Sequence, residues 1–256
     1  MTKTQSLPKG ASPKKMSWKN LILPVCIVSG FIFLSFLGTW QLKRLAWKEA
    51  LIARVEQNLH KPPLSIAEIE ALIKSGEDIE YRPVKVRGKF HHDKEQYFFA
   101  THKSNPGWYV YTPLEREDGS IVLLNRGFVP IEGKDPKIRL KGQVEGVVDI
   151  VGLARSAPSE KPNSFVPNND LTKNIYYWKS ITQMFAQSGF KAHPNKMMFF
   201  VDADEKPNPG NWPVGGVTLI KFSNSHLSYA LTWFGLAGAL LVVGGIFMFK
   251  RRREQS

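Results

Sequence analysis

His226 is the ionisable side chain of this chain whose position most suggests a chemical role, because the polar cluster around it runs directly into a long apolar segment. On a helix that starts here, His226 lies about one turn from Tyr229 and two turns from Trp233, so the three share one stripe. A neutral imidazole in this place could ligate haem iron at a membrane surface. The alternative is an interfacial histidine beside an aromatic belt of Tyr229 and Trp233.

A second group of candidate residues follows the other apolar segment, in the stretch GTWQLKR from Gly38 to Arg44. Arg44 could meet a carboxylate such as a haem propionate, or it could reach phosphate headgroups. Trp40 could offer a stacking surface or belong to an aromatic belt. A flat amphipathic ligand could therefore lie between the ends of two helices.

The remaining histidines give weaker signals. His91, His92 and Asp93, with His102, could supply metal ligands, but neighbouring residues on a strand point to opposite faces, so a solvated hairpin end explains them as well. His60 and His193 each precede a proline and carry no further signal. The sequence has no G-x-S-x-G, no H-E-x-x-H and no cysteine outside an apolar segment. We therefore expect no enzyme.

Two apolar segments of membrane-spanning length hold these candidates. Residues 21–42 contain no charge, and a helix of that length reaches about 30 Å, the thickness of a bilayer core. A second uncharged run has its dense part from Tyr229 to Phe249. The sequence predicts one transmembrane helix over residues 21–42 and another over residues 225–249, with the first kept as an uncleaved anchor.

The charges around these segments predict the topology. Residues 1–20 carry five lysines and no acid, and residues 250–256 carry four basic residues and one acid. By the positive-inside rule both tails are cytoplasmic and residues 43–224 are translocated. Most of the formal net charge of +13 therefore comes from the two tails that set the topology, and it gives no reason to expect nucleic-acid binding. A bacterial plasma membrane is expected, with the mitochondrial inner membrane as the alternative.

The translocated region contains no cysteine, because the single cysteine, Cys26, lies in the first apolar segment. It must therefore fold around an apolar core without disulfides. An amphipathic helix is predicted over residues 44–59, with Trp47, Leu51, Val55 and Leu59 on one face. Ser65 and Glu68 have the spacing of a capping box for a short second helix.

Alternating sequence after residue 81 predicts strands. Asp118-Gly119 between two such runs indicates a type I′ hairpin. Residues 157–170 are a predicted loop, and residues 176–190 contain one short helix. The predicted strands lie within residues 81–90, 107–130, 143–155 and 196–205. The expected fold is a membrane protein in which two transmembrane helices flank a mostly antiparallel β (α+β) domain.

Four stretches together resemble the surfeit locus protein one family: GTWQLKRLAWKEALI from Gly38, YRPVKVRGKF from Tyr81, VLLNRGFVP from Val122 and NSHLSYALTWFGLA from Asn224. Their order and placement match, and they cover nearly the whole chain between the tails. Two of these stretches depart from the common family pattern. Serines stand at 223 and 225 where many members have proline and asparagine, and Phe128 stands where many have tryptophan.

The resemblance implies an assembly factor, or chaperone, for haem-copper cytochrome c oxidase of the respiratory chain, acting in biogenesis of the catalytic subunit. Some bacterial members bind haem a through a histidine that matches His226, and the family's following tryptophan matches Trp233. The implied cofactor is transient haem a, and the implied partners are the oxidase catalytic subunit, the haem a synthesis machinery and membrane lipid. The alternative is a membrane-anchored scaffold that stabilises the immature subunit without binding haem.

Overall fold

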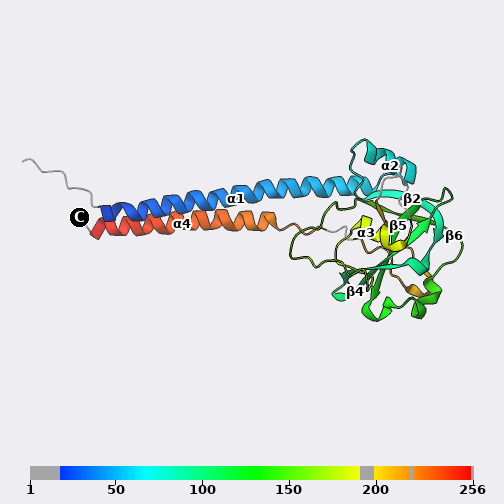
Figure 1. Ribbon diagram of the computed structural model, residues 1–256. Coiled ribbons are helices and arrows are strands. Elements are labelled where there is room, and N and C mark those ends of the chain that lie inside the picture. The colour runs from blue at the N-terminus through cyan, green and yellow to red at the C-terminus, as the bar shows by residue number, and fades with distance from the viewer. Residues whose placement is uncertain (1–17, 191–198, 219–221, 255–256) are drawn as a thin grey trace, which may run out of the picture. The chain divides into compact units, whose positions relative to one another are not determined.

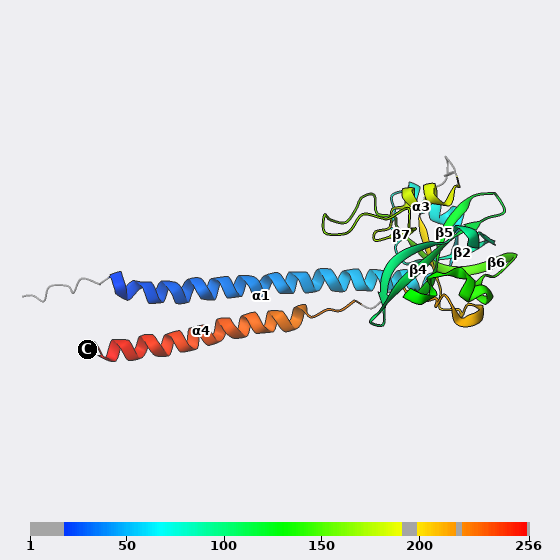
Figure 2. The ribbon, with the colours of Figure 1, turned by 60° about the horizontal axis from the view of Figure 1, so that its bottom comes forward.

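The computed structural model describes residues 18–190, 199–218 and 222–254 and divides into two compact units. The first unit comprises residues 1–51 and 223–256 and is a pair of antiparallel helices. Helix α1 runs from Trp18 to Leu59 and helix α4 from His226 to Glu254. Both are long and apolar enough to cross a membrane, as predicted. Figures 1 and 2 show the two helices side by side along most of α4.

Small residues on α4 let the two helices approach closely. Ala230, Ala237 and Gly244 recur every seven residues and are buried. A Cβ at Gly244 would lie 2.6 Å from the terminal methyl of Ile27 on α1, so a larger residue there would force the Ile27 side chain to move. In the same way, a Cβ at Gly38 on α1 would lie 2.7 Å from the Phe234 ring of α4. Such seams of small residues are typical of helix pairs in membranes.

The second unit, residues 52–222, is built around one mixed sheet with the strand order β1-β2-β6-β8-β5-β4-β3-β7. Three strand pairs are parallel, β1 with β2, β3 with β7 and β5 with β8, and the others are antiparallel. The strands are β1 Leu64–Ser65, β2 Arg82–Phe90, β3 Gln96–His102, β4 Asn105–Glu115, β5 Ile121–Pro130, β6 Val147–Arg155, β7 Ile175–Tyr176 and β8 Phe200–Ala203.

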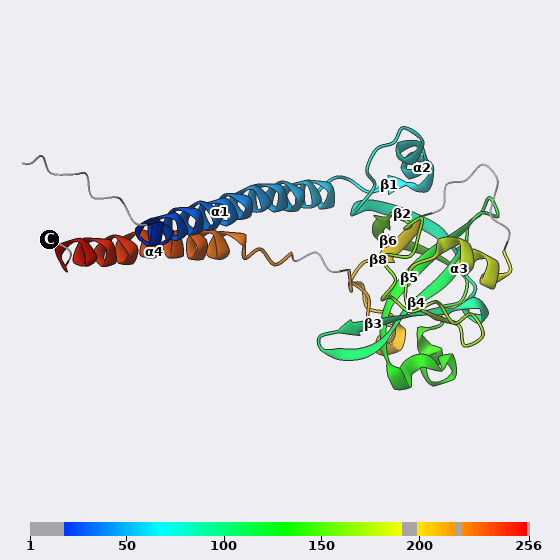
Figure 3. The same ribbon diagram turned by 60° about the vertical axis from the view of Figure 1, so that its left-hand side comes forward.

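An additional antiparallel contact between β2 and β4 closes five of these strands into a barrel. At the closing point Lys89 pairs with Glu115 and Phe90 with Leu114. A Cβ on the neighbouring Gly88 would lie 2.3 Å from the carbonyl oxygen of Glu115, so a larger residue would push the strands apart. Figure 3 shows the strands curving around one another with α2 and α3 outside them.

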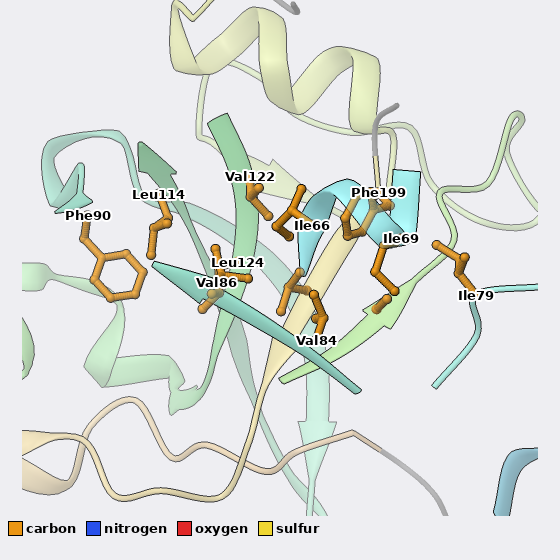
Figure 4. Close-up of a cluster of buried hydrophobic side chains, with 12 residues drawn as sticks. Ile66, Ile69, Ile79, Val84, Val86, Phe90, Leu114, Val122, Leu124 and Phe199 are labelled. Carbon is orange, nitrogen blue, oxygen red and sulfur yellow. The ribbon is translucent and has the colours of Figure 1, made fainter. Parts of the chain in front are cut away.

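Short helices cover the barrel. Helix α2, Ile66–Lys74, has the predicted capping box, in which the Ser65 hydroxyl accepts from the Glu68 amide and the Glu68 carboxylate accepts from the Ser65 amide. Its residues Ile66 and Ile69 point into the main core, where Figure 4 shows them near Val84. The other helices are α3 Ile181–Ser188 and the 3₁₀ segments η1 His92–Lys94, η2 Ile131–Lys134, η3 Pro136–Gly142 and η4 Pro209–Asn211.

Most predicted elements are present. The helix predicted over residues 44–59 is confirmed as the last part of α1, which continues without a break to Leu59. The type I′ turn is wrong, because only Gly119 of the Asp118-Gly119 pair has positive φ, and the Arg116 amide donates to the Ser120 carbonyl. This pattern is a type I turn followed by a left-handed glycine, in a three-residue loop. Strand β3 and the two-residue strands β1 and β7 were not predicted.

Candidate functional site

His226 is the first residue of α4, at the end of the helix seam. The side-chain oxygen of Asn224 accepts a hydrogen bond from the His226 amide at 3.4 Å. The Tyr229 amide donates to the Ser225 carbonyl, so Ser225 stands at the N-cap position of α4. Asn224, one residue earlier, binds the first helical amide, that of His226 itself.

The His226 ring is held from the other helix. Its Nδ1 atom lies 2.8 Å from Oε1 of Gln41 on α1, a residue 185 positions earlier in the chain. Gln41 is 9% exposed and His226 is half-buried, so this contact is partly shielded from solvent. The other ring nitrogen, Nε2, has no hydrogen-bond partner within residues 18–190, 199–218 and 222–254. One ring nitrogen is thus engaged and the other is free.

Helical periodicity places the predicted site residues on one flank of the helix pair. On α4, Tyr229 and Trp233 follow His226 at one and two turns, and all three turn to the same side of the buried Ala230–Ala237 row. On α1, Trp40 and Arg44 lie to one side of Gln41 by the same rule. Because the helices are antiparallel, with Gly38 facing Phe234 and Gln41 facing His226, the two sides coincide.

The side chains on this flank offer aromatic surface and one cation. Trp40 is 50% exposed and Tyr229 is 54% exposed, while Trp233 is half-buried. The guanidinium of Arg44 lies 4.2 Å from the ring centroid of Trp47, a cation–π contact one turn along α1. Trp47 was not predicted as a site residue; it was assigned only to the apolar face of residues 44–59. Its spacing of seven from Trp40 is the signal that could have found it.

The other candidate ligands do not form a metal site in the described part of the chain. His91 pairs with Glu115 at 2.7 Å, whereas His92 contacts the Val144 carbonyl and Arg126. His102 packs on the ring of Phe128. No cluster of three metal-ligating side chains occurs among the residues the structure describes. His193 lies outside the described residues.

A buried ionic cluster in the barrel unit was missed from the sequence. The carboxylate of Glu95 accepts hydrogen bonds from Arg139, one of them at 3.1 Å, and lies 3.5 Å from Arg126. All three side chains are 1% exposed. Arg126 also donates to the Gly142 carbonyl and the Asn208 side chain. Arg126 interrupts the apolar run of β5, which is a signal that could have found it, whereas nothing in the sequence around Arg139 shows that it faces inward.

Burial and charge shift the pKa values in this cluster in opposite ways. Burial alone would raise the pKa of Glu95, but hydrogen bonds from Arg139 and the charges of Arg139 and Arg126 hold it below its usual value. Burial lowers the pKa of Arg126 to about 10, although Glu95 opposes this. The carboxylate is therefore ionised at neutral pH, and the cluster fixes η1, η3 and β5 together.

The ionic cluster holds an exposed apolar surface, defined here as Ile131, Ile138 and Leu140. These side chains are 51%, 58% and 65% exposed. Arg139 lies between two of them in sequence and points inward to Glu95 and the Gly133 carbonyl. A hollow of about 470 Å³ is lined by residues that include Tyr97, and a second of about 270 Å³ by residues that include Trp212.

The chain is similar to proteins from a wide range of organisms. A model of the SURF1 family matches residues 28–238. Surfeit locus protein 1 of Xenopus tropicalis is 36% identical over 241 residues, which cover 88% of this chain and 73% of the frog protein. The protein of the same name in Homo sapiens is 34% identical over 251 residues, covering 91% of this chain and 78% of the human protein.

A relative that is covered over more of its own length shows a similar identity. A SURF1-like protein of Monosiga brevicollis is 35% identical over 249 residues, covering 92% of this chain and 87% of that protein. The family match over residues 28–238 contains the whole barrel unit and parts of α1 and α4, so the similarity does not rest on the apolar segments alone. This chain belongs to the SURF1 family.

Proposed function

We propose that this protein is an assembly factor for haem-copper cytochrome c oxidase that holds haem a at the outer membrane face before it reaches the catalytic subunit. Family membership supports the assembly role through the resemblance set out above. The haem-holding role is supported by the contact between His226 and Gln41 across the helix pair. Given that contact, helical periodicity directs Tyr229, Trp233, Trp40 and Arg44 to the same flank as His226.

Each residue of this flank suits a part of haem. His226 would supply the axial imidazole through Nε2, which has no hydrogen-bond partner among the described residues. Arg44 would pair with a propionate, because guanidinium and carboxylate form strong charge-assisted hydrogen bonds. Trp40, Tyr229 and Trp233 would cover the flat apolar ring. When bound, the haem would supply an iron atom that accepts the lone pair of the His226 imidazole.

A carrier must also release its cargo, and the exposure of the flank is consistent with release. Trp40 and Tyr229 are each about half exposed, so the flank is open rather than enclosed. A single histidine, His226, would hold the haem iron more weakly than two histidines would, which suits transfer to a receiving protein. No catalytic step is proposed for this chain.

The test is to purify the protein in detergent from a host that makes haem a and to record the visible spectrum and the pyridine haemochrome. We expect the wild type to carry haem a and His226→Ala to lack it. His60→Ala is the matched control, because His60 is exposed at the end of α1 and contacts only the Glu56 carbonyl. A colourless wild type, or equal colour in wild type and His226→Ala, would contradict the proposal.

The second candidate function is a scaffold that binds the immature catalytic subunit and never touches haem. The exposed apolar surface favours it, because the ionic cluster holds these aliphatic side chains in water, an arrangement typical of protein contacts. In that case Ile138→Asp with Leu140→Asp would lower oxidase maturation in cells, and His226→Ala would leave it unchanged. The reverse result favours the haem carrier.

The proposed location is a bacterial plasma membrane, with both termini in the cytoplasm and the barrel in the periplasm; the mitochondrial inner membrane is the alternative. The basic residues at the end of α4, Arg251, Arg252 and Arg253, support this orientation. Alkaline phosphatase, which is active only in an oxidising compartment, provides the test. A fusion after residue 160 should be active, and a fusion after residue 256 should be inactive.

A further inference from the structure

We propose that Gln41 is a positioning residue that holds His226 as the Nδ1–H tautomer, so that Nε2 carries the free lone pair. The purpose of this arrangement rests on the proposed haem-binding function, but the tautomer itself does not depend on it. The resemblance to the family gives importance to the motif that contains Gln41 without giving the residue a role. The contact across the helix seam supplies that role.

The distance and the chemistry of the two atoms carry the inference. Nδ1 of His226 lies 2.8 Å from Oε1 of Gln41, which is within hydrogen-bond range. An amide oxygen can only accept, so the imidazole must donate, and the proton must lie on Nδ1. A neutral imidazole carries one ring proton, so Nε2 is then unprotonated. Only an unprotonated ring nitrogen can ligate a metal.

The surroundings of Gln41 make this contact persistent. Gln41 is 9% exposed and lies in the seam between two apolar helices. A buried amide that loses its partner is strongly unfavourable, so the Gln41 oxygen and the His226 ring are expected to stay paired. The neighbouring Gly38 permits the close packing of the helices that brings the two side chains together.

The same arrangement recurs in metal sites generally. A histidine that binds metal through one nitrogen usually donates its other N–H to a carboxylate, carbonyl or water, which fixes the ring orientation and raises ligand basicity. Loss of such a partner typically lowers metal affinity by roughly 10- to 100-fold. Gln41 would play this part for His226 from a helix at the opposite end of the chain.

The test measures the tautomer directly in the full-length protein without haem. The protein is labelled with ¹⁵N-histidine, purified in detergent from cells that cannot make haem a, and studied by NMR at neutral pH. His226 is assigned by its disappearance in His226→Ala. An unprotonated ring nitrogen has a ¹⁵N shift far downfield of a protonated one, so the two tautomers are distinguished. We expect Nδ1 protonated and Nε2 unprotonated in the wild type.

Three variants separate positioning from packing. Gln41→Leu removes the acceptor at similar volume, and we expect His226 to shift toward the Nε2–H tautomer. Gln41→Glu keeps an oxygen acceptor, so the Nδ1–H tautomer should be retained. Thr39→Val is the matched control, because the Thr39 hydroxyl bonds only to the Ser35 carbonyl on its own helix and is exposed. This control should leave the His226 spectrum unchanged.

A titration with ferric haem b then links the tautomer to binding. We expect Gln41→Leu to bind roughly 10- to 100-fold more weakly than wild type and Gln41→Glu to restore binding. A wild type with the proton on Nε2, or a Gln41→Leu variant with an unchanged tautomer, would overturn the inference. If the wild type shows the Nδ1–H tautomer, Gln41→Leu shifts it, and neither binds haem, Gln41 keeps its role while the proposed function fails.

Discussion

Replacing the buried Glu95 by glutamine should destabilise the barrel unit far more than neutralising a carboxylate on its surface. The substitution keeps the size of the side chain but removes the one negative charge between two guanidiniums. Glu95, Arg126 and Arg139 are all 1% exposed, so solvent cannot replace the lost carboxylate. Removing one partner from a buried ion pair leaves an uncompensated charge and costs about 3–5 kcal/mol.

That cost is a large share of a typical domain stability of about 5–15 kcal/mol. With an m-value of about 1–3 kcal/mol per molar urea, the unfolding midpoint should fall by at least about 1 M. Pulse proteolysis of the full-length protein in detergent and urea measures this midpoint for the barrel, because a protease cuts only unfolded chain. The double variant Glu95→Gln with Arg139→Gln should lose less than the sum of the two single losses, since their charges are coupled.

The matched control is Glu117→Gln, which breaks an ion pair with Arg87 at 3.1 Å on the surface. The two side chains are 56% and 77% exposed, so water can solvate the remaining arginine and little change is expected. If Glu95→Gln shifted the midpoint no more than Glu117→Gln, the ionic cluster would contribute no more than a surface pair. The cluster would then not be what holds the exposed apolar surface in place.

Three further predictions concern acid stability, helix packing and capping. The pKa of Glu95 is lowered in the folded state, so the stabilisation that this carboxylate gives is present above its unfolded pKa near 4.5 and is lost as pH falls through the folded value. The urea unfolding midpoint of the wild type should therefore drop in acid, and that of Glu95→Gln should drop less. Gly244→Leu should reduce the stability of the helix pair by about 1–3 kcal/mol, because the new side chain would overlap with Ile27. Gly245→Leu is the control, since Gly245 has open space beside it. Equal thermal melting curves of the two variants in detergent would refute this prediction. Ser65→Ala should cost about 1 kcal/mol in the same urea assay through loss of the capping box, and an unchanged midpoint would exclude a stabilising cap.

The sequence predicts elements well where one local signal decides them. Uncharged length identifies α1 and α4, and the Ser65–Glu68 spacing identifies the start of α2, because each depends on neighbours in the chain. The Asp118-Gly119 turn was predicted wrongly because a dipeptide does not specify how many residues the loop contains. Strand β3 escaped because its residues alternate poorly in polarity.

In the candidate site, too, local sequence predicts some residues and only the tertiary fold reveals the others. His226, Tyr229 and Trp233 share a helix, so their stripe follows from periodicity alone. Gln41 gains its partner only through the pairing of α1 with α4, which no local pattern encodes. The buried arginines pose the same problem, because Arg126 and Arg139 look like surface residues until β5 and η3 meet around Glu95.

The pairing of Gln41 with His226 also sets a time at which the site can exist. The two residues stand 185 positions apart, so ribosomal synthesis delivers Gln41, Trp40 and Arg44 long before α4. Until α4 has been made and has packed against the seam, the imidazole and its acceptor are separate. A nascent or truncated chain therefore lacks the contact between Gln41 and His226, and the proposed binding of haem would require the finished polypeptide.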